Sequence, residues 1–164
     1  TLAEYCIQPH SIAMAGAFDV VEHIDAQENF LSQIHEVLQP NGLFFMTVPA
    51  LSWLWSFEDV HAGHFRRYSL RSASKVLENT GFTIAFASYF FRPLVIPILL
   101  LRSIPSFLRI RKTTNSGVTK KEHHLPDSLS GRLISRGLSR EREQLKEQKK
   151  LAVGSSLVVV AKKA

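Results

Sequence analysis

The clearest pattern of hydrophobic and polar positions lies between Gly16 and Pro49. Across residues 27–38 the apolar side chains recur at three- and four-residue spacing, which predicts a helix with one buried face. Pro40-Asn41-Gly42 then predicts a helix end and a turn. Residues 43–48 are almost wholly apolar without alternation, as in a strand covered on both faces of a parallel sheet. A helix followed by such a strand is half of a β-α-β unit, and these sheets bind ligands at the carboxyl ends of their strands.

The same patterns predict further elements on both sides of this stretch. A short apolar run predicts a strand over residues 11–15, and β-rich segments predict strands over 83–89 and 156–161. Residues 70–80 have helical spacing, with Ser69 suited to the N-cap and Gly81 to the position after the helix. Residues 128–150 are strongly charged and compatible with a helix.

Two connections differ from ordinary loops. Residues 50–68 contain two Trp, two His, two acidic residues and an Arg pair, and long loops of this kind usually have a function. Residues 90–110 are the most hydrophobic stretch, but three prolines and two flanking arginines exclude a membrane-spanning helix. We expect broken helical turns there, either covering a pocket or lying on a membrane surface. Residues 112–121 are polar and predict a loop.

The order of these elements predicts an α/β fold. One hallmark of nucleotide-binding α/β domains is a glycine-rich turn after the first strand. The eight glycines of this sequence never form a GxG pattern, so this turn has no counterpart in residues 1–164.

Length and composition fit one domain of a soluble globular protein. The chain has 164 residues, 45% of them hydrophobic and 21% charged. A single cysteine, Cys6, excludes a disulfide framework and a cysteine zinc site. Because the first ten residues lack the pattern of a signal peptide, we expect a cytoplasmic protein.

The net charge of +6 is concentrated in one segment. Residues 1–101 hold 5 Lys/Arg and 9 Asp/Glu, whereas residues 102–150 hold 13 and 5. The basic segment is either a solvated helical face or a contact for phosphates or an anionic membrane. A membrane contact would involve residues 90–112. Its basic residues are not interleaved with aromatic ones, so we expect no nucleic-acid partner.

A set of motifs is spread over most of residues 11–161, most sparsely over residues 112–150. These motifs are Gly16-Ala17-Phe18-Asp19-Val20-Val21-Glu22-His23-Ile24, Leu38-Gln39-Pro40-Asn41-Gly42-Leu43, Val48-Pro49, Trp53-Leu54-Trp55, Asp59, Gly63-His64, Arg66-Arg67-Tyr68, Gly81-Phe82 and Gly154-Ser155-Ser156-Leu157-Val158-Val159-Val160-Ala161. Together they resemble one family, the class I S-adenosylmethionine-dependent methyltransferases in their small-molecule branch.

The resemblance implies the second half of a Rossmann-like methyltransferase sheet. The last strand, 156–161, would run antiparallel between strands 43–48 and 83–89. Residues 1–164 would then be a single partial methyltransferase domain, with residues 90–150 as a helical and loop insertion before the last strand. The glycine-rich first half, which holds the cofactor ribose, has no counterpart. Whether this chain binds S-adenosylmethionine alone therefore stays open.

The resemblance also places cofactor contacts. Gly16, Ala17 and Phe18 would lie against the methionine end of S-adenosylmethionine, with Asp19 and His23 beside them. A small residue allows close backbone approach, and an aromatic ring can pack on the sulfonium; a simple turn would need the same residues. Asp19, Glu22 and His23 resemble a divalent-ion motif of some quinone-pathway O-methyltransferases. We favour a bracing role for them and expect no metal.

The acceptor side would follow the strand 43–48. His64 is the candidate general base, with Asp59 as its orienting partner. Arg66 and Arg67 are candidates for holding an anionic acceptor, and an Arg–Asp pair that fastens the loop explains them equally well. The remaining substrate-binding candidates are Tyr68, Trp53 and Trp55; core packing is the alternative for all three. His61 and His64 lack a third ligand at zinc-site spacing.

The sequence thus favours methyl transfer from S-adenosylmethionine to a small or lipid-like acceptor, carried out by a protein of which this chain is one part. The alternative is a non-catalytic module that uses an exposed sheet edge for partner binding or homodimerisation. Peripheral membrane contact through residues 90–112 is compatible with both.

Overall fold

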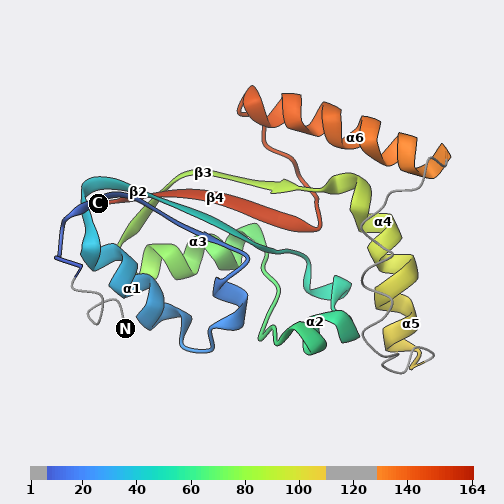
Figure 1. The fold of residues 1–164 in the computed structure, drawn as a ribbon, viewed down its shortest axis with the longest axis horizontal. Helices are drawn as coiled ribbons and strands as arrows, with labels where there is room; N and C mark the ends of the chain where they lie inside the picture. The colour runs from blue at the N-terminus through green and yellow to red at the C-terminus, as the bar shows by residue number, and fades with distance from the viewer. Residues whose placement is uncertain (1–6, 110–128) are drawn as a thin grey trace.

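A four-stranded sheet forms the centre of the chain in the computed structural model, which describes residues 7–109 and 129–164 (Figure 1). The strand order is β1-β2-β4-β3. β1 (Ile12–Phe18) pairs in parallel with β2 (Leu38–Pro49). β4 (Ser156–Lys163) lies antiparallel between β2 and β3 (Phe82–Phe90). The predicted position of the last strand, antiparallel between the strands at 43–48 and 83–89, is confirmed.

Two helices cover one face of this sheet. α1 (Gln27–Val37) and α3 (Leu70–Asn79) lie on the same side of it in Figure 1. They bury the apolar positions that the sequence pattern predicts, against alternate residues of the central strands. The buried side chains of these elements include Leu31, Ile34 and Val37 of α1, Ala73, Val76 and Leu77 of α3, Phe44, Met46 and Val48 of β2, and Leu157, Val159 and Ala161 of β4.

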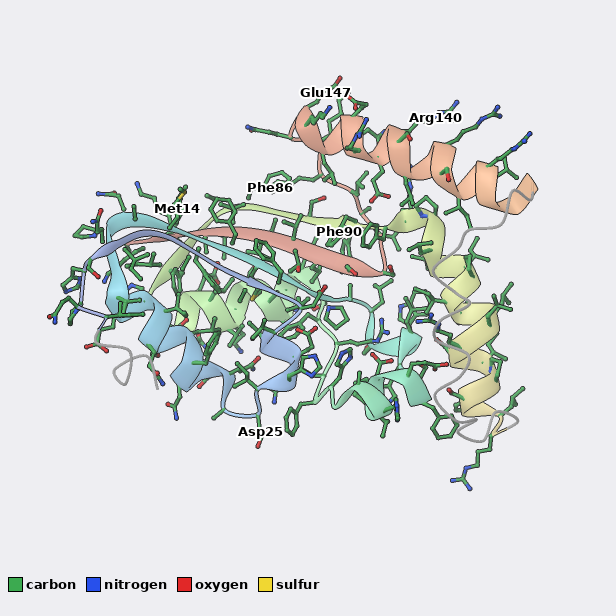
Figure 2. The ribbon with its side chains drawn as sticks, viewed as in Figure 1. Met14, Asp25, Phe86, Phe90, Arg140 and Glu147 are labelled. Atoms are coloured by element: carbon green, nitrogen blue, oxygen red, sulfur yellow. The ribbon has the colours of Figure 1, made fainter. Side chains whose placement is uncertain are left out.

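The opposite face of the sheet is only partly covered. Along β2, Leu43, Phe45 and Thr47 are intermediate in exposure, so the expectation of a strand buried on both faces is wrong. α6 (Leu129–Lys146) lies on this side in Figure 1, near the end of β3, and the carboxylate of Glu141 accepts hydrogen bonds from the backbone N–H groups of Phe91 and Arg92. Figure 2 shows Met14 and Phe86 on the same open side.

β1 and β2 are longer than the strands that we predicted from their apolar runs, 11–15 and 43–48. β1 continues to Phe18 because residues 16–18 pair with residues 45–47 of β2. β2 begins at Leu38, and the register with β1 shifts between Ile12 and Met14. The predicted turn therefore becomes a bulge inside β2, in which Asn41 has φ 65°.

The connection between β2 and α3 contains two short helices, although we expected an irregular loop. The 3₁₀ turn η3 (Ser52–Leu54) precedes α2 (Phe57–Ala62). α2 forms because Ser56 and Asp59 make a capping box, and Gly63 ends it with φ 76°. At α3 the predicted N-cap is confirmed, since Ser69 accepts from the N–H of Ser72.

Broken helical turns follow β3, as the prolines predict. They are η4 (Arg92–Leu94), α4 (Val95–Ile98), the π-helical η5 (Leu99–Ser103) and α5 (Ile104–Phe107). The predicted loop over residues 112–121 lies outside the described residues, and the predicted helix over 128–150 is confirmed by α6. Within the described part of the chain, no helix combines the length and the hydropathy needed to cross a bilayer.

Candidate functional site

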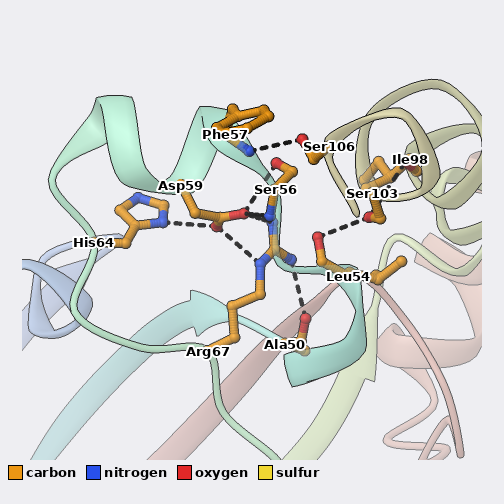
Figure 3. A network of polar contacts seen from close by, with 10 residues as sticks. All are labelled: Ala50, Leu54, Ser56, Phe57, Asp59, His64, Arg67, Ile98, Ser103 and Ser106. Carbon is orange, nitrogen blue, oxygen red and sulfur yellow. Dashed lines mark hydrogen bonds and ion pairs between the residues drawn. The ribbon is translucent and has the colours of Figure 1, made fainter. Parts of the chain in front are cut away.

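Asp59 is the centre of a buried polar network at the carboxyl end of β2 (Figure 3). Its side chain is 1% exposed and accepts bonds from three residues. Nδ1 of His64 donates to Oδ1 at 2.9 Å. Nε of Arg67 donates to Oδ1 at 2.8 Å and Nη2 to Oδ2 at 3.1 Å. The N–H of Ser56 donates to Oδ2 at 2.9 Å, so both carboxylate oxygens are fully used.

These partners keep Asp59 ionised. Burial alone would raise the pKa of Asp59, because a charged carboxylate loses hydration. The hydrogen bonds and the positive charge of Arg67, together with the bonds from His64 and Ser56, outweigh burial and lower the pKa below its ordinary value. Asp59 therefore accepts the Nδ1–H of His64 and leaves Nε2 of that ring free of this bond.

Arg67 joins two parts of the connection. Besides its two bonds to Asp59, its Nη1 donates to the carbonyl of Ala50 at 3.0 Å, just beyond the end of β2. The side chain is 10% exposed. This geometry matches the loop-fastening alternative for Arg67, since its guanidinium is already engaged within the protein.

The segment around His64 is tied to the loop that follows β1. The N–H of Phe65 donates to the carbonyl of Glu22 at 2.8 Å. Arg66 donates to the carbonyl and the carboxylate of Asp25 at 3.0 and 3.2 Å. The Tyr68 hydroxyl donates to Oε1 of Gln27 at 2.6 Å. The loop after β1 and the segment from His64 to Tyr68 lie far apart in sequence, but these bonds hold them side by side.

Burial also changes the acidity of Tyr68. The side chain is 3% exposed, and burial raises the pKa of its hydroxyl to about 12. Its ring belongs to the hydrophobic core. This position fits core packing, the alternative to substrate binding for Tyr68, and the hydroxyl is neutral at physiological pH.

The predicted cofactor residues fall into two groups. Gly16, Ala17, Phe18 and Asp19 end β1, where the ring of Phe18 lies so close to Gly16 that a Cβ there would come within 2.9 Å of it. Asp19 accepts from Oγ1 of Thr47 at 3.3 Å, which fixes its carboxylate to β2. His23 belongs to the 3₁₀ turn η2 (Val21–His23), and its ring packs edge-on against His64 with centroids 4.7 Å apart.

One cluster next to these residues has the composition of a metal site. Glu22, His23 and His64 each offer one ligand atom, and the three atoms lie within 4.8 Å of one another. Glu22 is 1% exposed. The sequence analysis grouped Glu22 and His23 with Asp19 and did not predict that His64 lies beside them. The contacts between the loop after β1 and residues 65–66 bring His64 there.

An apolar cavity of about 440 Å³ is lined by residues of η3, α2 and the broken helical turns η5 and α5. Trp53 and Trp55 line it together with the broken helical turns, so these two of the five predicted substrate residues share a cavity. Arg66, Arg67 and Tyr68 do not line it. The lining residues are Ser52, Trp53, Trp55, Ser56, Phe57, Val60, Leu99, Ser103, Ile104, Ser106 and Phe107.

Two serines hold the walls of this cavity together. Ser103 donates to the carbonyl of Leu54 at 2.8 Å, and Ser106 accepts from the N–H of Phe57 at 2.9 Å (Figure 3). Sequence reasoning allowed that residues 90–110 cover a pocket but missed both serines. Their placement at three-residue spacing in an otherwise apolar segment was the available signal.

Comparisons with known proteins bear on the fold of the chain. A methyltransferase domain family matches residues 10–85 in sequence. Among curated proteins, no sequence matches this chain significantly. A methyltransferase candidate of Haloferax volcanii, solved in complex with the Trm112 methyltransferase activator, is 11% identical with a TM-score of 0.54, and the match covers 95% of this chain and 56% of that one.

Two further solved structures show the same fold. A candidate sarcosine dimethylglycine methyltransferase of Galdieria sulphuraria is 16% identical with a TM-score of 0.54, covering 100% of this chain and 57% of that one. Phosphoethanolamine N-methyltransferase 2 of Haemonchus contortus, in complex with S-adenosyl-L-methionine, is 16% identical with a TM-score of 0.50, covering 96% and 34%. This chain therefore spans between a third and three fifths of their lengths. The chain is thus similar in sequence to a methyltransferase domain over residues 10–85, and it shares its fold with solved methyltransferases, one of them in complex with S-adenosyl-L-methionine.

Proposed function

We propose that this chain supplies one cofactor wall and the acceptor wall of an enzyme that methylates a small or lipid-like acceptor with an apolar body. The observation that carries the proposal is the apolar cavity lined by Trp53 and Trp55. Its volume of about 440 Å³ is in the range of small-molecule sites. It follows the carboxyl end of β2, the edge at which α/β sheets bind their ligands.

The cofactor wall in this proposal is the end of β1. Gly16 to Asp19 reach the same edge as the cavity, and Phe18 is 64% exposed there. An exposed aromatic ring can pack on the sulfonium of S-adenosylmethionine, and the fixed carboxylate of Asp19 can accept a hydrogen bond from a polar part of it.

A second wall would come from outside the described strands. The outer edge of β1 has no neighbour among the strands that the structure describes, and Met14 beside it is 63% exposed. The side of the sheet opposite α1 and α3 is also partly open. Both features support the proposal that these four strands are the second half of a larger sheet, with residues 90–150 inserted before the last strand.

In the proposed reaction, the methyl group moves in line from the cofactor sulfur to a nucleophilic atom of the acceptor. The electrons of the broken carbon–sulfur bond stay on sulfur, which leaves S-adenosylhomocysteine. Holding the two reactants in line supplies most of the rate enhancement. Where the acceptor must lose a proton, Nε2 of His64 takes it, because Asp59 holds Nδ1–H and stabilises the imidazolium.

The broken helical turns support an acceptor that lies in a membrane surface. Ile96, Leu101 and Phe107 are 66%, 67% and 89% exposed on this segment. Arg92 begins this segment and Arg102 lies within it, and basic residues of this kind are common in helices that lie at an anionic interface. The cavity opens beside these residues, since Phe107 also lines it.

The test is methyl transfer from tritiated S-adenosylmethionine by the protein that contains this chain, with lipid extracts and water-soluble amines and phenols as acceptors. We expect label in the organic phase, and we expect Trp55→Ala to raise the KM for the acceptor at least fivefold. Label that enters only water-soluble acceptors, with Trp55→Ala unchanged, would exclude the apolar acceptor.

The second candidate function is a non-catalytic interaction module. The exposed β1 edge favours it, because unpaired edge strands pair readily with other chains. Light scattering behind a sizing column and thermal unfolding, each with and without S-adenosylhomocysteine, separate the two: a dimer whose mass does not change with the ligand supports the module, and a ligand-induced change in thermal stability supports the enzyme.

A further inference from the structure

Two histidines and one glutamate meet at the edge formed by the loops after β1 and α2. Glu22 and His23 belong to η2, whereas His64 follows α2. One ligand atom from each lies within 4.8 Å of the other two. The backbone bond from Phe65 N–H to the Glu22 carbonyl, 2.8 Å long, keeps the two loops at this separation.

One carboxylate oxygen of Glu22 is buried without a hydrogen-bond partner among the described residues. This atom is Oε2, and the side chain as a whole is 1% exposed. A buried carboxylate oxygen left in this state is costly unless a proton, a water or a cation compensates it.

His64 is already oriented as a ligand. Its Nδ1 donates to Asp59 at 2.9 Å, so the ring presents Nε2 as its free acceptor atom. Asp59 is itself fixed by Arg67 and Ser56. A carboxylate that receives the N–H of a metal-binding histidine is the usual outer support of such a ligand, because it sets the tautomer and increases the basicity of the ring.

The donor set selects the class of ion. Two imidazoles and one carboxylate suit zinc and its neighbours among the divalent transition metals, and three protein ligands leave a position open for water or substrate. Mg²⁺ and Ca²⁺ prefer sites made of oxygen atoms alone. We infer that Glu22, His23 and His64 form a site for a divalent transition metal ion such as Zn²⁺, supported from outside by Asp59.

The geometry requires a small adjustment. Ligand atoms about 2.1 Å from zinc lie roughly 3.4 Å apart in a tetrahedron, so atoms that are 4.8 Å apart need to approach by roughly 1.4 Å. His23 is exposed, and its side chain has room to make this movement. The histidine rings already meet edge to face with centroids 4.7 Å apart, which brings nitrogen atoms of both rings to one region.

The consequence for the reaction rests on the proposed function. With an ion bound, Nε2 of His64 is a ligand, and an acceptor oxygen at the open position of the ion releases its proton to solvent at lower pH than the free acceptor does. His64 as a base and His64 as a ligand therefore predict different metal dependence of methyl transfer.

The binding itself is tested on the chain without S-adenosylmethionine, so its outcome is separate from that of methyl transfer. Zn²⁺ is titrated calorimetrically into the metal-free protein, and Co²⁺ is added as a spectroscopic probe. We expect one strong Zn²⁺ site per chain and a visible Co²⁺ absorption typical of low coordination number. Glu22→Gln and His23→Ala should each weaken Zn²⁺ binding at least tenfold.

The matched control is His61→Ala. His61 is an exposed histidine of α2, three residues before His64 and outside the cluster. This variant should keep wild-type affinity, and circular dichroism should show that Glu22→Gln and His23→Ala remain folded. No strong Zn²⁺ site in the wild type, or equal affinity in Glu22→Gln, His23→Ala and wild type, would overturn the inference, as would an equal loss in His61→Ala.

Discussion

Asp59 connects the fold of the candidate site with its chemistry. The same carboxylate caps α2 through Ser56, fastens Arg67 and orients His64. Both interpretations of the sequence at this position are therefore compatible with the structure, because the carboxylate that orients His64 also holds the loop. Spacing suggested an Asp–His pair, but it could not show that Arg67 would occupy the other side of the carboxylate.

Replacing Asp59 with Asn should destabilise the protein at neutral pH by about 3 kcal/mol, because Arg67 would be left buried beside a neutral amide. The folded state lowers the pKa of Asp59 below its ordinary value of 3.8. Its contribution to the free energy of unfolding is therefore complete above that value and disappears as the pH falls through the folded-state pKa. Urea unfolding at pH 7 and at pH 3 measures this, and a difference between variant and wild type that does not shrink at pH 3 contradicts it.

Gly154 shows a constraint that periodicity cannot reveal. A Cβ at this position would collide with the carbonyl oxygen of Phe90 and lie 2.7 Å from the backbone nitrogen of the same residue. Because the obstacle is backbone, no rotamer change can relieve it. We expect Gly154→Ala to lower the free energy of unfolding by about 3 kcal/mol.

The control for this prediction is Gly63→Ala. Gly63 has φ 76°, and no atom lies within 4 Å of the place that an added methyl carbon would take. Only the left-handed backbone therefore opposes alanine there, at about 1 kcal/mol. Denaturant unfolding should rank the two variants in this order. Equal losses would mean that the contact with Phe90 yields more easily than its geometry indicates.

At the scale of elements, the longer helices and the proline-broken turns were predictable, whereas the bulge in β2 and the short helix α2 were not. α1 and α3 follow from apolar spacing, and Ser69 and Gly81 mark the ends of α3. The bulge at residues 38–42 depends on pairing with β1, which no local pattern contains. α2 was missed because its six residues are too few for a period, although the capping-box serine and aspartate were visible.

The capping of α3 gives a prediction at this scale. Ser69 accepts the Ser72 N–H at 3.1 Å, so Ser69→Ala should cost about 1 kcal/mol of stability. Ser74→Ala in the interior of the same helix should cost nothing measurable, since alanine has the higher helix propensity. Thermal unfolding of both variants checks the pair; a greater loss from Ser74→Ala would place the support of the helix elsewhere.

At the scale of the whole molecule, the exposed apolar side chains of the described residues include two groups at separate places. One is the open side of the sheet beside β1, and the other is the segment from η4 to α5. The sequence predicted the second as a broken helix over a pocket or on a membrane. It could not predict the first, because exposure of a β-strand depends on which elements pack over it.

Membrane contact through the η4–α5 segment is testable with vesicles. The chain should co-sediment with vesicles rich in phosphatidylserine at low salt and far less with phosphatidylcholine. Replacing Leu101 and Phe107 with Ser should weaken the partitioning about tenfold, because these exposed side chains would insert. Leu133→Ser on α6, a site of equal exposure to Leu101, is the control. Absence of binding to both vesicle types would remove the membrane surface from the proposal.

The edge at the end of β1 is the part of the chain that we expect to meet the cofactor. Titration of the isotopically labelled chain with S-adenosylhomocysteine, followed by backbone amide NMR, tests this most directly and tolerates weak affinity. We predict that the largest shift changes fall on Gly16 to Asp19, His23 and Thr47, and that Asp19→Ala reduces them. Shift changes confined to α6, or none at millimolar ligand, would contradict a cofactor site at this edge.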